Sequence, residues 1–291
     1  MTRFRLVLLL IPVLAMAFIV VGCGSDDSSD DSSSTDTTTT TASTCSPDNL
    51  DTFSEGVLTI GTDSPGYPPY IEDNDPTNGK GFEGALGYAI ADQLGFNKSQ
   101  VEWTTVPFNS SYAPGPKKFD FDLNQISITP AREKVVDFST PYYTANQAVL
   151  VNKDSDLADV TNLEGLKDAT IGVQVGTTSL DAVTTAIEPS NDPKVFNNSN
   201  DVVSALKQDQ VDAIVVDLPT ALFLQSDSLP DAKVAGQFQA EGGDEWGALL
   251  AKDSSLTKCV DQAIDTLDSD GILDEITEQW MSASVEAPEL N

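Results

Sequence analysis

Residues 127–143 read Ser-Ile-Thr-Pro-Ala-Arg-Glu-Lys-Val-Val-Asp-Phe-Ser-Thr-Pro-Tyr-Tyr. A single arginine, Arg132, follows a strand-like run of Ile, Ser and Thr and precedes a segment rich in aromatic residues and proline. A guanidinium keeps its charge, and its planar fork matches a carboxylate through two parallel hydrogen bonds. The segment therefore suits a buried carboxylate-binding site, although an ion pair between Arg132 and its neighbour Glu133 or Asp137 explains these residues equally well.

The chain begins with a segment typical of an export signal. Two arginines precede an apolar run from Leu6 to Val21, which is too short to span a membrane comfortably. The run ends in Val-Val-Gly-Cys, a sequence typical of bacterial lipoprotein processing. We expect residues 1–22 to be a lipoprotein signal peptide and Cys23 to carry the lipid, with an ordinary transmembrane anchor as the alternative. Each buried acyl methylene contributes about 0.8 kcal/mol, so several chains hold a protein at a membrane.

The next segment lacks the composition needed for a core. Residues 23–45 consist almost wholly of Ser, Thr, Asp and Gly. Such a segment cannot bury enough apolar surface to offset the entropy of folding, so we expect a disordered tether. The roughly 245 residues that remain are enough for two lobes, each with its own core.

Charge and composition exclude several classes of function. The formal net charge is −31, and such a surface repels phosphates, so we expect no nucleic-acid partner. The chain has no histidine, which removes the commonest general base and the commonest zinc ligand. We expect neither a metal nor a cofactor. If Cys23 is lipidated, Cys45 and Cys259 remain, and the sequence allows either a disulfide or two free thiols.

Hydrophobic periodicity predicts strands that alternate with helices, which is typical of α/β proteins with mainly parallel sheets. The total is too long for one sheet, so two α/β units fit better. The expected strands are 57–61, 101–106, 121–128, 147–151, 169–173, 211–216, 232–235 and 246–251, and the expected helices are 83–94, 176–187, 202–208, 218–224, 256–267 and 272–281.

Polar candidates lie where the expected strands end, which is where ligands bind in open α/β sheets. Each has a structural alternative: Thr177, Thr178 and Asp217 could simply cap helices, and a tyrosine could belong to a core. The candidates are Asp63, Tyr67, Tyr70, Gln125, Ser127, Arg132, Thr177, Thr178 and Asp217.

Taken in order, these motifs resemble those of the bacterial extracellular solute-binding proteins of family 3, the binding lipoproteins of polar amino-acid ABC transporters. The resemblance covers residues 55–281. The matching pieces are Gly61-Thr-Asp63, Tyr67-Pro-Pro-Tyr70, Gly81-Phe-Glu83, Ser127-Ile-Thr-Pro-Ala-Arg132, Val136-Asp-Phe-Ser-Thr-Pro-Tyr142, Ile171-Gly-Val-Gln-Val-Gly-Thr-Thr178, Val211-Asp-Ala-Ile-Val-Val-Asp217, Asp270-Gly-Ile272 and Gln279-Trp280.

The resemblance implies an α/β fold of two lobes, the periplasmic-binding-protein type II or Venus-flytrap fold. Lobe 1 is then expected at residues 46–150 plus 241–291, and lobe 2 at residues 151–240. This division places Cys259 in the same lobe as the residues that follow Cys45, which favours the disulfide over two thiols.

The resemblance also implies how an amino acid would be held by its carboxylate. Arg132 would bind the α-carboxylate from lobe 1, with help from Ser127. The backbone and hydroxyl groups of Thr177 and Thr178 would complete this grip from lobe 2.

The remaining ligand contacts are likewise implied by the resemblance. Asp217 would bind the α-ammonium, with the carbonyl of Gln125 as a second acceptor. Tyr67, or alternatively Tyr70, would stack on the ligand, and Asp63 and Gln174 would face its side chain. Each charged end of the zwitterion would then meet an opposite charge or a hydrogen bond, which its burial requires.

The expected function is that of a lipid-anchored receptor on the extracytoplasmic face of the bacterial cell membrane. It would bind an amino acid as a monomer and deliver it to an ABC permease and its ATPase, without enzymatic activity. Two alternatives are an enzyme similar to cyclohexadienyl or arogenate dehydratases and a ligand-binding sensor lipoprotein.

Overall fold

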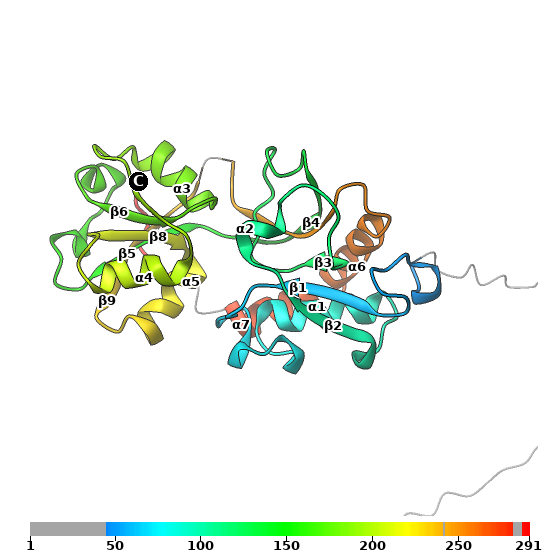
Figure 1. The fold of residues 1–291 in the computed structure, drawn as a ribbon. Coiled ribbons are helices and arrows are strands. Elements are labelled where there is room, and N and C mark those ends of the chain that lie inside the picture. Colours follow the sequence, from blue (N-terminus) through cyan, green and yellow to red (C-terminus); the bar gives the residue numbers. More distant parts are fainter. Residues whose placement is uncertain (1–44, 241, 282–286) are drawn as a thin grey trace, which may run out of the picture. The chain divides into compact units, whose positions relative to one another are not determined.

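The structure, a computed structural model, describes residues 45–240, 242–281 and 287–291 (Figure 1). The expected signal peptide, the lipidated Cys23 and the tether up to residue 44 lie outside these residues. Among the helices of the described ranges, none is both long and apolar enough to cross a membrane.

The first lobe is built on a mixed five-stranded sheet in the order β2-β1-β3-β10-β4. β1 pairs in parallel with β2 and β3, whereas β10 runs antiparallel to both β3 and β4. All residues of β1 are buried, which fits its uninterrupted apolar and small composition. The strands are β1 Leu58–Thr62, β2 Val101–Thr105, β3 Phe121–Asp122, β4 Val136–Thr144 and β10 Glu245–Ala251.

The second lobe has a mixed sheet in the order β7-β6-β8-β5-β9. Alternate residues of β5 belong to different cores: Val149 and Val151 lie in one, and Ala148 and Leu150 in the other. Both faces of this sheet are therefore covered, as the continuous apolar run of β5 requires. The strands are β5 Gln147–Asn152, β6 Ile171–Gln174, β7 Lys194–Phe196, β8 Ala213–Asp217 and β9 Ala232–Phe238.

Helices cover both sheets (Figure 1). α1, α6 and α7 share the main core of lobe 1, whereas α4 and α5 pack on one face of the second sheet and α3 on the other. The α-helices are α1 Phe82–Gln93, α2 Phe108–Ser111, α3 Thr178–Ala182, α4 Ser199–Lys207, α5 Leu218–Phe223, α6 Thr257–Ser269 and α7 Ile272–Met281. Single π-turns extend α3 over Val183–Ile187 and α5 over Leu224–Ser228, and short 3-10 turns lie at Pro47–Asn49, Glu72–Asn74, Pro76–Asn78, Lys98–Gln100, Asp156–Asp159 and Leu163–Leu166.

Three features of the sheets differ from the sequence prediction. The sheets are mixed rather than mainly parallel, because β10 in lobe 1 and β5 in lobe 2 run against their neighbours. The expected strand 121–128 shortens to β3, since the chain turns through a left-handed residue, Gln125 (φ 48°). β4 and β7 were not predicted, and β4 forms despite a proline because it is the edge strand of its sheet.

The lobes divide at slightly different residues than expected. β5 lies wholly in the second sheet, so residues 147–150 belong with lobe 2. The C-terminal residues also join lobe 2: Leu290 is buried in its core, and Glu289 forms a parallel bridge with Gln237. Gly236 makes this approach possible, because a Cβ atom there would lie 2.6 Å from the Leu290 side chain. Residues 287–291 form no helix or strand, so hydrophobic periodicity could not predict that they pack against lobe 2.

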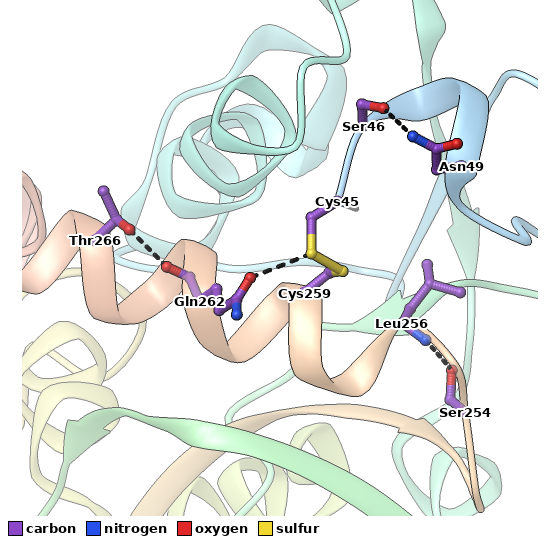
Figure 2. The surroundings of a disulfide bond; sticks show 8 residues. All are labelled: Cys45, Ser46, Asn49, Ser254, Leu256, Cys259, Gln262 and Thr266. Atoms are coloured by element: carbon purple, nitrogen blue, oxygen red, sulfur yellow. Dashed lines mark hydrogen bonds between the residues drawn. A yellow bond between two sulfur atoms is a disulfide. The ribbon is translucent and has the colours of Figure 1, made fainter. Parts of the chain in front are cut away.

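A disulfide joins Cys45 to Cys259 in lobe 1 (Figure 2). Of the two alternatives that the sequence left open, the paired one is present. Cys259 lies on α6 and is buried in the main core of the lobe, and Cys45 packs against the same core. The bond therefore fixes the first described residue to a helix that is 214 residues further along the chain.

We expect loss of this disulfide to lower the free energy of unfolding by about 2–4 kcal/mol, because the bond restricts a long loop of the unfolded chain. For a domain of this size the melting temperature should fall by roughly 5–15 °C. Thermal unfolding with and without reductant measures the effect. A Cys45→Ser/Cys259→Ser variant is the control and should be insensitive to reductant; equal melting temperatures of the oxidised and reduced wild type would contradict the expectation.

Candidate ligand-binding cavity

A cavity of about 860 Å³ is lined by residues of both lobes. Its wall combines apolar side chains with hydroxyls, amides and carboxylates at the ends of strands and the starts of helices. Lobe 1 contributes Asp63, Tyr67, Tyr70, Asn124, Gln125 and Ser127, and lobe 2 contributes Gln174, Thr177, Thr178, Asp201, Asp217 and Thr220.

The two tyrosines of the loop after β1 differ in their surroundings. Tyr70 is buried (4% exposed), packs edge-on against Trp246 and shares a hydrogen bond of 2.8 Å with Thr220. Tyr67 is 40% exposed and donates from its hydroxyl to Asn200 Oδ1 at 2.8 Å. Tyr67 therefore has the ring that a ligand could reach, whereas Tyr70 belongs to the core.

Arg132 does not line this cavity; it lines an adjoining recess of about 270 Å³. Its side chain is buried (7% exposed) and donates to the Ser127 carbonyl at 2.6 Å and to the Gly176 carbonyl of lobe 2 at 2.9 Å. The guanidinium carbon lies 4.8 Å from the ring centroid of Tyr112, a cation–π distance. Burial lowers the pKa of Arg132 from its ordinary value.

The recess and the cavity meet at Thr177 and Thr178, which line both. The Thr178 hydroxyl lies 3.2 Å from the Ser127 hydroxyl and donates to Asp244 at 3.0 Å. Thr177 caps α3, accepting from the Leu180 N–H at 3.3 Å, so the helix-cap alternative describes its hydroxyl. A small set of hydroxyls thus separates Arg132 from the cavity that Asp217 lines.

Asp217 ends β8 and does not cap α5 with its side chain. Its carboxylate accepts from the Gln147 amide at 2.7 Å, and the same amide nitrogen donates to Asp244. Burial raises the pKa of Asp217 well above its ordinary value, and the neighbouring charge of Asp244 raises it further. An acid pair bridged by one amide is suited to a cation, whose charge would favour the ionised form of Asp217.

The structure brings three further sequence candidates to the cavity wall but gives their side chains protein partners. Asp63 accepts from the Phe108 N–H at 3.1 Å, and Gln174 accepts from the Ser199 hydroxyl at 2.6 Å. The Gln125 side-chain amide donates to Glu83, whereas the expected role of Gln125 as a second acceptor for the ammonium concerns its carbonyl.

Sequence reasoning missed Asp244 and Glu83. Asp244 is 1% exposed and lies in the segment that returns from lobe 2 to β10, where neither periodicity nor a motif distinguishes it from a loop acid. The sequence marks Glu83 only as part of the Gly-Phe-Glu motif. In the structure it is fully buried at the start of α1 and accepts hydrogen bonds from Gln125 and Tyr142. Burial raises the pKa of Glu83 from 4.5 to about 7.

Two buried polar groups near the cavity have no hydrogen-bond partner among the described residues. The first is the side-chain amide nitrogen of Asn124, which lines the cavity. The second is the carboxyl group of Asp122, two residues earlier at the end of β3, where both oxygens lack a partner. Burial raises the pKa of Asp122 well above its ordinary value, and the charge of Glu83 raises it further. In the part of the chain that the structure describes, no group of three or more acidic, cysteine or histidine residues is arranged to hold a metal ion.

Comparison with known proteins gives the class of this protein. Residues 58–283 match the sequence model of the bacterial extracellular solute-binding proteins, family 3, and the chain belongs to that family. Its two-lobed fold is the type II fold of amino-acid-binding proteins.

Individual relatives of the chain are named as binding proteins for amino acids. The chain is 30% identical over 253 residues to the arginine-binding extracellular protein ArtP of Bacillus subtilis, covering 82% of this chain and 92% of ArtP. It is 28% identical over 233 residues to the L-cystine-binding protein TcyJ of Escherichia coli K12, covering 79% of this chain and 84% of TcyJ. Among solved structures, an ancestral arginine-binding protein bound to glutamine has a TM-score of 0.66 at 32% identity, covering 78% of this chain and 98% of that one.

We expect the protein to lose stability as the pH rises from 5 to 8. The pKa of Glu83 is higher in the folded state than in the unfolded state, so its contribution is fully present below pH 4.5 and is lost as the pH rises through about 7. The free energy of unfolding should fall by up to about 3 kcal/mol from this group, while Asp122 and Asp217 act in the same direction.

Denaturant unfolding at several pH values measures this change. Glu83→Gln is the matched variant, because it keeps the shape of the side chain and removes the titration. The pH dependence should be shallower in the variant, and identical slopes in the two proteins would show that Glu83 does not titrate as expected.

Proposed function

We propose that this protein is a lipid-anchored receptor that binds one amino acid between its lobes and delivers it to an ABC permease and its ATPase. Arg132 would bind the α-carboxylate, with Ser127, Thr177 and Thr178, and Asp217 would bind the α-ammonium. The lipid would be on Cys23, at the extracytoplasmic face of the membrane, and the receptor would act as a monomer. Support for the family role comes from relatives that are named as binding proteins for amino acids.

One observation carries the ligand-binding part of the proposal. The buried fork of Arg132 uses two of its five donors on backbone carbonyls of the described residues, one from each lobe. A carbonyl carries only a partial negative charge, so a carboxylate would be a stronger partner for a desolvated guanidinium. A ligand carboxylate that replaces the Gly176 carbonyl would place the rest of the ligand beside Thr178, where the recess joins the cavity and Asp217 lies.

The charge balance of the cavity favours a cationic side chain on the ligand. Its wall includes three acids, Asp63, Asp201 and Asp217, and one base, Lys207. If Asp217 binds the α-ammonium, Asp63 and Asp201 remain for the ligand's side chain. Arginine and lysine are therefore the first candidates, with Gln174 as an amide contact.

We propose amino-acid binding, rather than catalysis, as the function. The relatives are named as binding proteins, and a further solved relative at 28% identity (TM-score 0.63, covering 77% of this chain and 94% of that one) is described as an ancestral amino-acid-binding protein, a precursor of cyclohexadienyl dehydratase. The enzymatic alternative predicts turnover of prephenate or arogenate, which chromatography of an incubated sample would reveal. A sensor role would require a partner other than a permease.

Replacing Arg132 with alanine should abolish binding. The ligand carboxylate would be buried without a charged partner, at a cost of about 3–5 kcal/mol, and Arg132→Lys should bind weakly because it lacks the fork. Isothermal titration calorimetry measures the affinity. Lys134→Ala, which removes an exposed cation two residues away, is the control and should bind as the wild type does; near-native affinity of Arg132→Ala would refute the assignment.

A thermal-shift screen over the common L-amino acids should identify a cationic ligand. A ligand at 100 times its dissociation constant adds about 2.7 kcal/mol to the free energy of unfolding. The amide of the best ligand, which lacks the carboxylate, and its N-acetyl derivative, which lacks the ammonium, should both fail to raise the melting temperature. Equal shifts with these derivatives would show that the two charged ends are not what the protein binds.

A further inference from the structure

At residues 124 and 125, which line the cavity, the backbone departs from the sheet of lobe 1. Before it, Leu123 donates to the Gly61 carbonyl at 3.0 Å, and after it, Gly247 donates to the Ile126 carbonyl at 3.2 Å. Ser127 then forms a bridge with Trp246 of β10. The ladder thus holds both sides of a two-residue excursion, and Gln125 is the left-handed residue within it (φ 48°).

Glu83 is the residue that binds this excursion. Its Oε1 atom accepts from the Gln125 N–H at 2.7 Å, and its Oε2 atom accepts from the Gln125 side-chain amide. The hydroxyl of Tyr142, on β4, donates to the same carboxylate. Three donors on two oxygens suit an ionised carboxylate, which accepts through both atoms.

The backbone conformation of Gln125 needs such support. A left-handed conformation costs a residue with a Cβ about 1–2 kcal/mol, and only glycine adopts it freely. Hydrogen bonds to a buried charge are strong enough to offset that cost. The position of Glu83 on the first turn of α1 also favours its negative charge, through the helix dipole.

We propose that Glu83 is a positioning residue of the binding cavity, whose carboxylate holds Gln125 in its left-handed conformation and so fixes the wall formed by Asn124, Gln125 and Ser127. This inference rests on the proposed function, because it concerns the same cavity. Glu83 itself does not line the cavity, so it acts through Gln125. Glu83 also contacts a second lining residue, since its N–H donates to the Tyr70 carbonyl at 3.1 Å.

The test is the affinity of four variants for the best ligand of the amino-acid screen, measured by calorimetry at pH 8, where the wild-type Glu83 is ionised. Glu83→Gln should bind roughly 10- to 100-fold more weakly, the loss expected for a hydrogen bond to a charged group. Adding Gln125→Gly to Glu83→Gln should recover at least about threefold, because glycine needs no support in this conformation. Adding Gln125→Ala instead should recover nothing.

Tyr142→Phe is the matched control. It removes a donor from the same buried carboxylate but leaves both contacts of Glu83 with Gln125, so its affinity should stay within about threefold of the wild type even if the melting temperature falls. A purely structural role for Glu83 would instead give equal losses in Tyr142→Phe and Glu83→Gln, and equal recovery with glycine and alanine. Either result overturns the proposal.

The outcome also separates this proposal from the function on which it rests. A wild type that binds no amino acid overturns both, whereas a wild type that loses binding in Arg132→Ala but not in Glu83→Gln overturns this one alone. If Glu83→Gln does not fold, amide hydrogen exchange of Gln125 in the wild type decides. Protection of roughly 100-fold or more supports the contact with Glu83, and exchange at the rate of an unprotected amide excludes it.

Discussion

The site depends on how the buried positive charge of Arg132 is stabilised in the protein interior. Arg132 has lost most of its hydration, and the loss is offset by two carbonyl acceptors, by the faces of Tyr112 and Phe108, and by the field of nearby acids. One of those carbonyls, that of Gly176, belongs to the other lobe. The guanidinium therefore links the two lobes electrostatically, and any ligand carboxylate must compete with a partner that is already present.

The Gly176 turn explains why that competition is possible. Gly176 has a φ of 75° and lies so close to the Tyr112 hydroxyl that a Cβ atom there would be 2.4 Å from it. Only glycine permits both the left-handed turn and this approach, and the turn directs the carbonyl toward Arg132 while the following residues begin α3. The turn therefore offers an acceptor to Arg132 directly before the first residues of α3.

The sequence predicted most of the fold because most of the elements are buried runs or amphipathic helices with clear ends. It failed where tertiary structure overrides local pattern. The run 121–128 reads as one strand, but the support that Glu83 gives to Gln125 from another element allows the chain to turn there. β4 contains Pro141 and reads as irregular, yet pairing with β10 along one edge makes it the longest strand of its sheet.

The same distinction applies to the site. Arg132 lines the adjoining recess rather than the cavity. Asp217, Thr178 and Tyr67 could be placed at the cavity wall from the sequence, because each ends a strand or follows one within a few residues. Asp244 could not, because its role depends on Gln147, 97 residues away, which bridges it to Asp217.

These two residues stand on the segments through which the chain passes between the sheets: Gln147 opens β5 and Asp244 precedes β10. Burial and the charge of Asp244 raise the pKa of Asp217, and a cation bound at Asp217 would offset the repulsion between the two carboxylates. Gln147 donates to both acids, so one amide joins the acid of the cavity wall to the acid before β10. Each acid of the buried pair thus keeps a hydrogen bond to the same amide, which offsets part of the cost of burying the two acids beside each other.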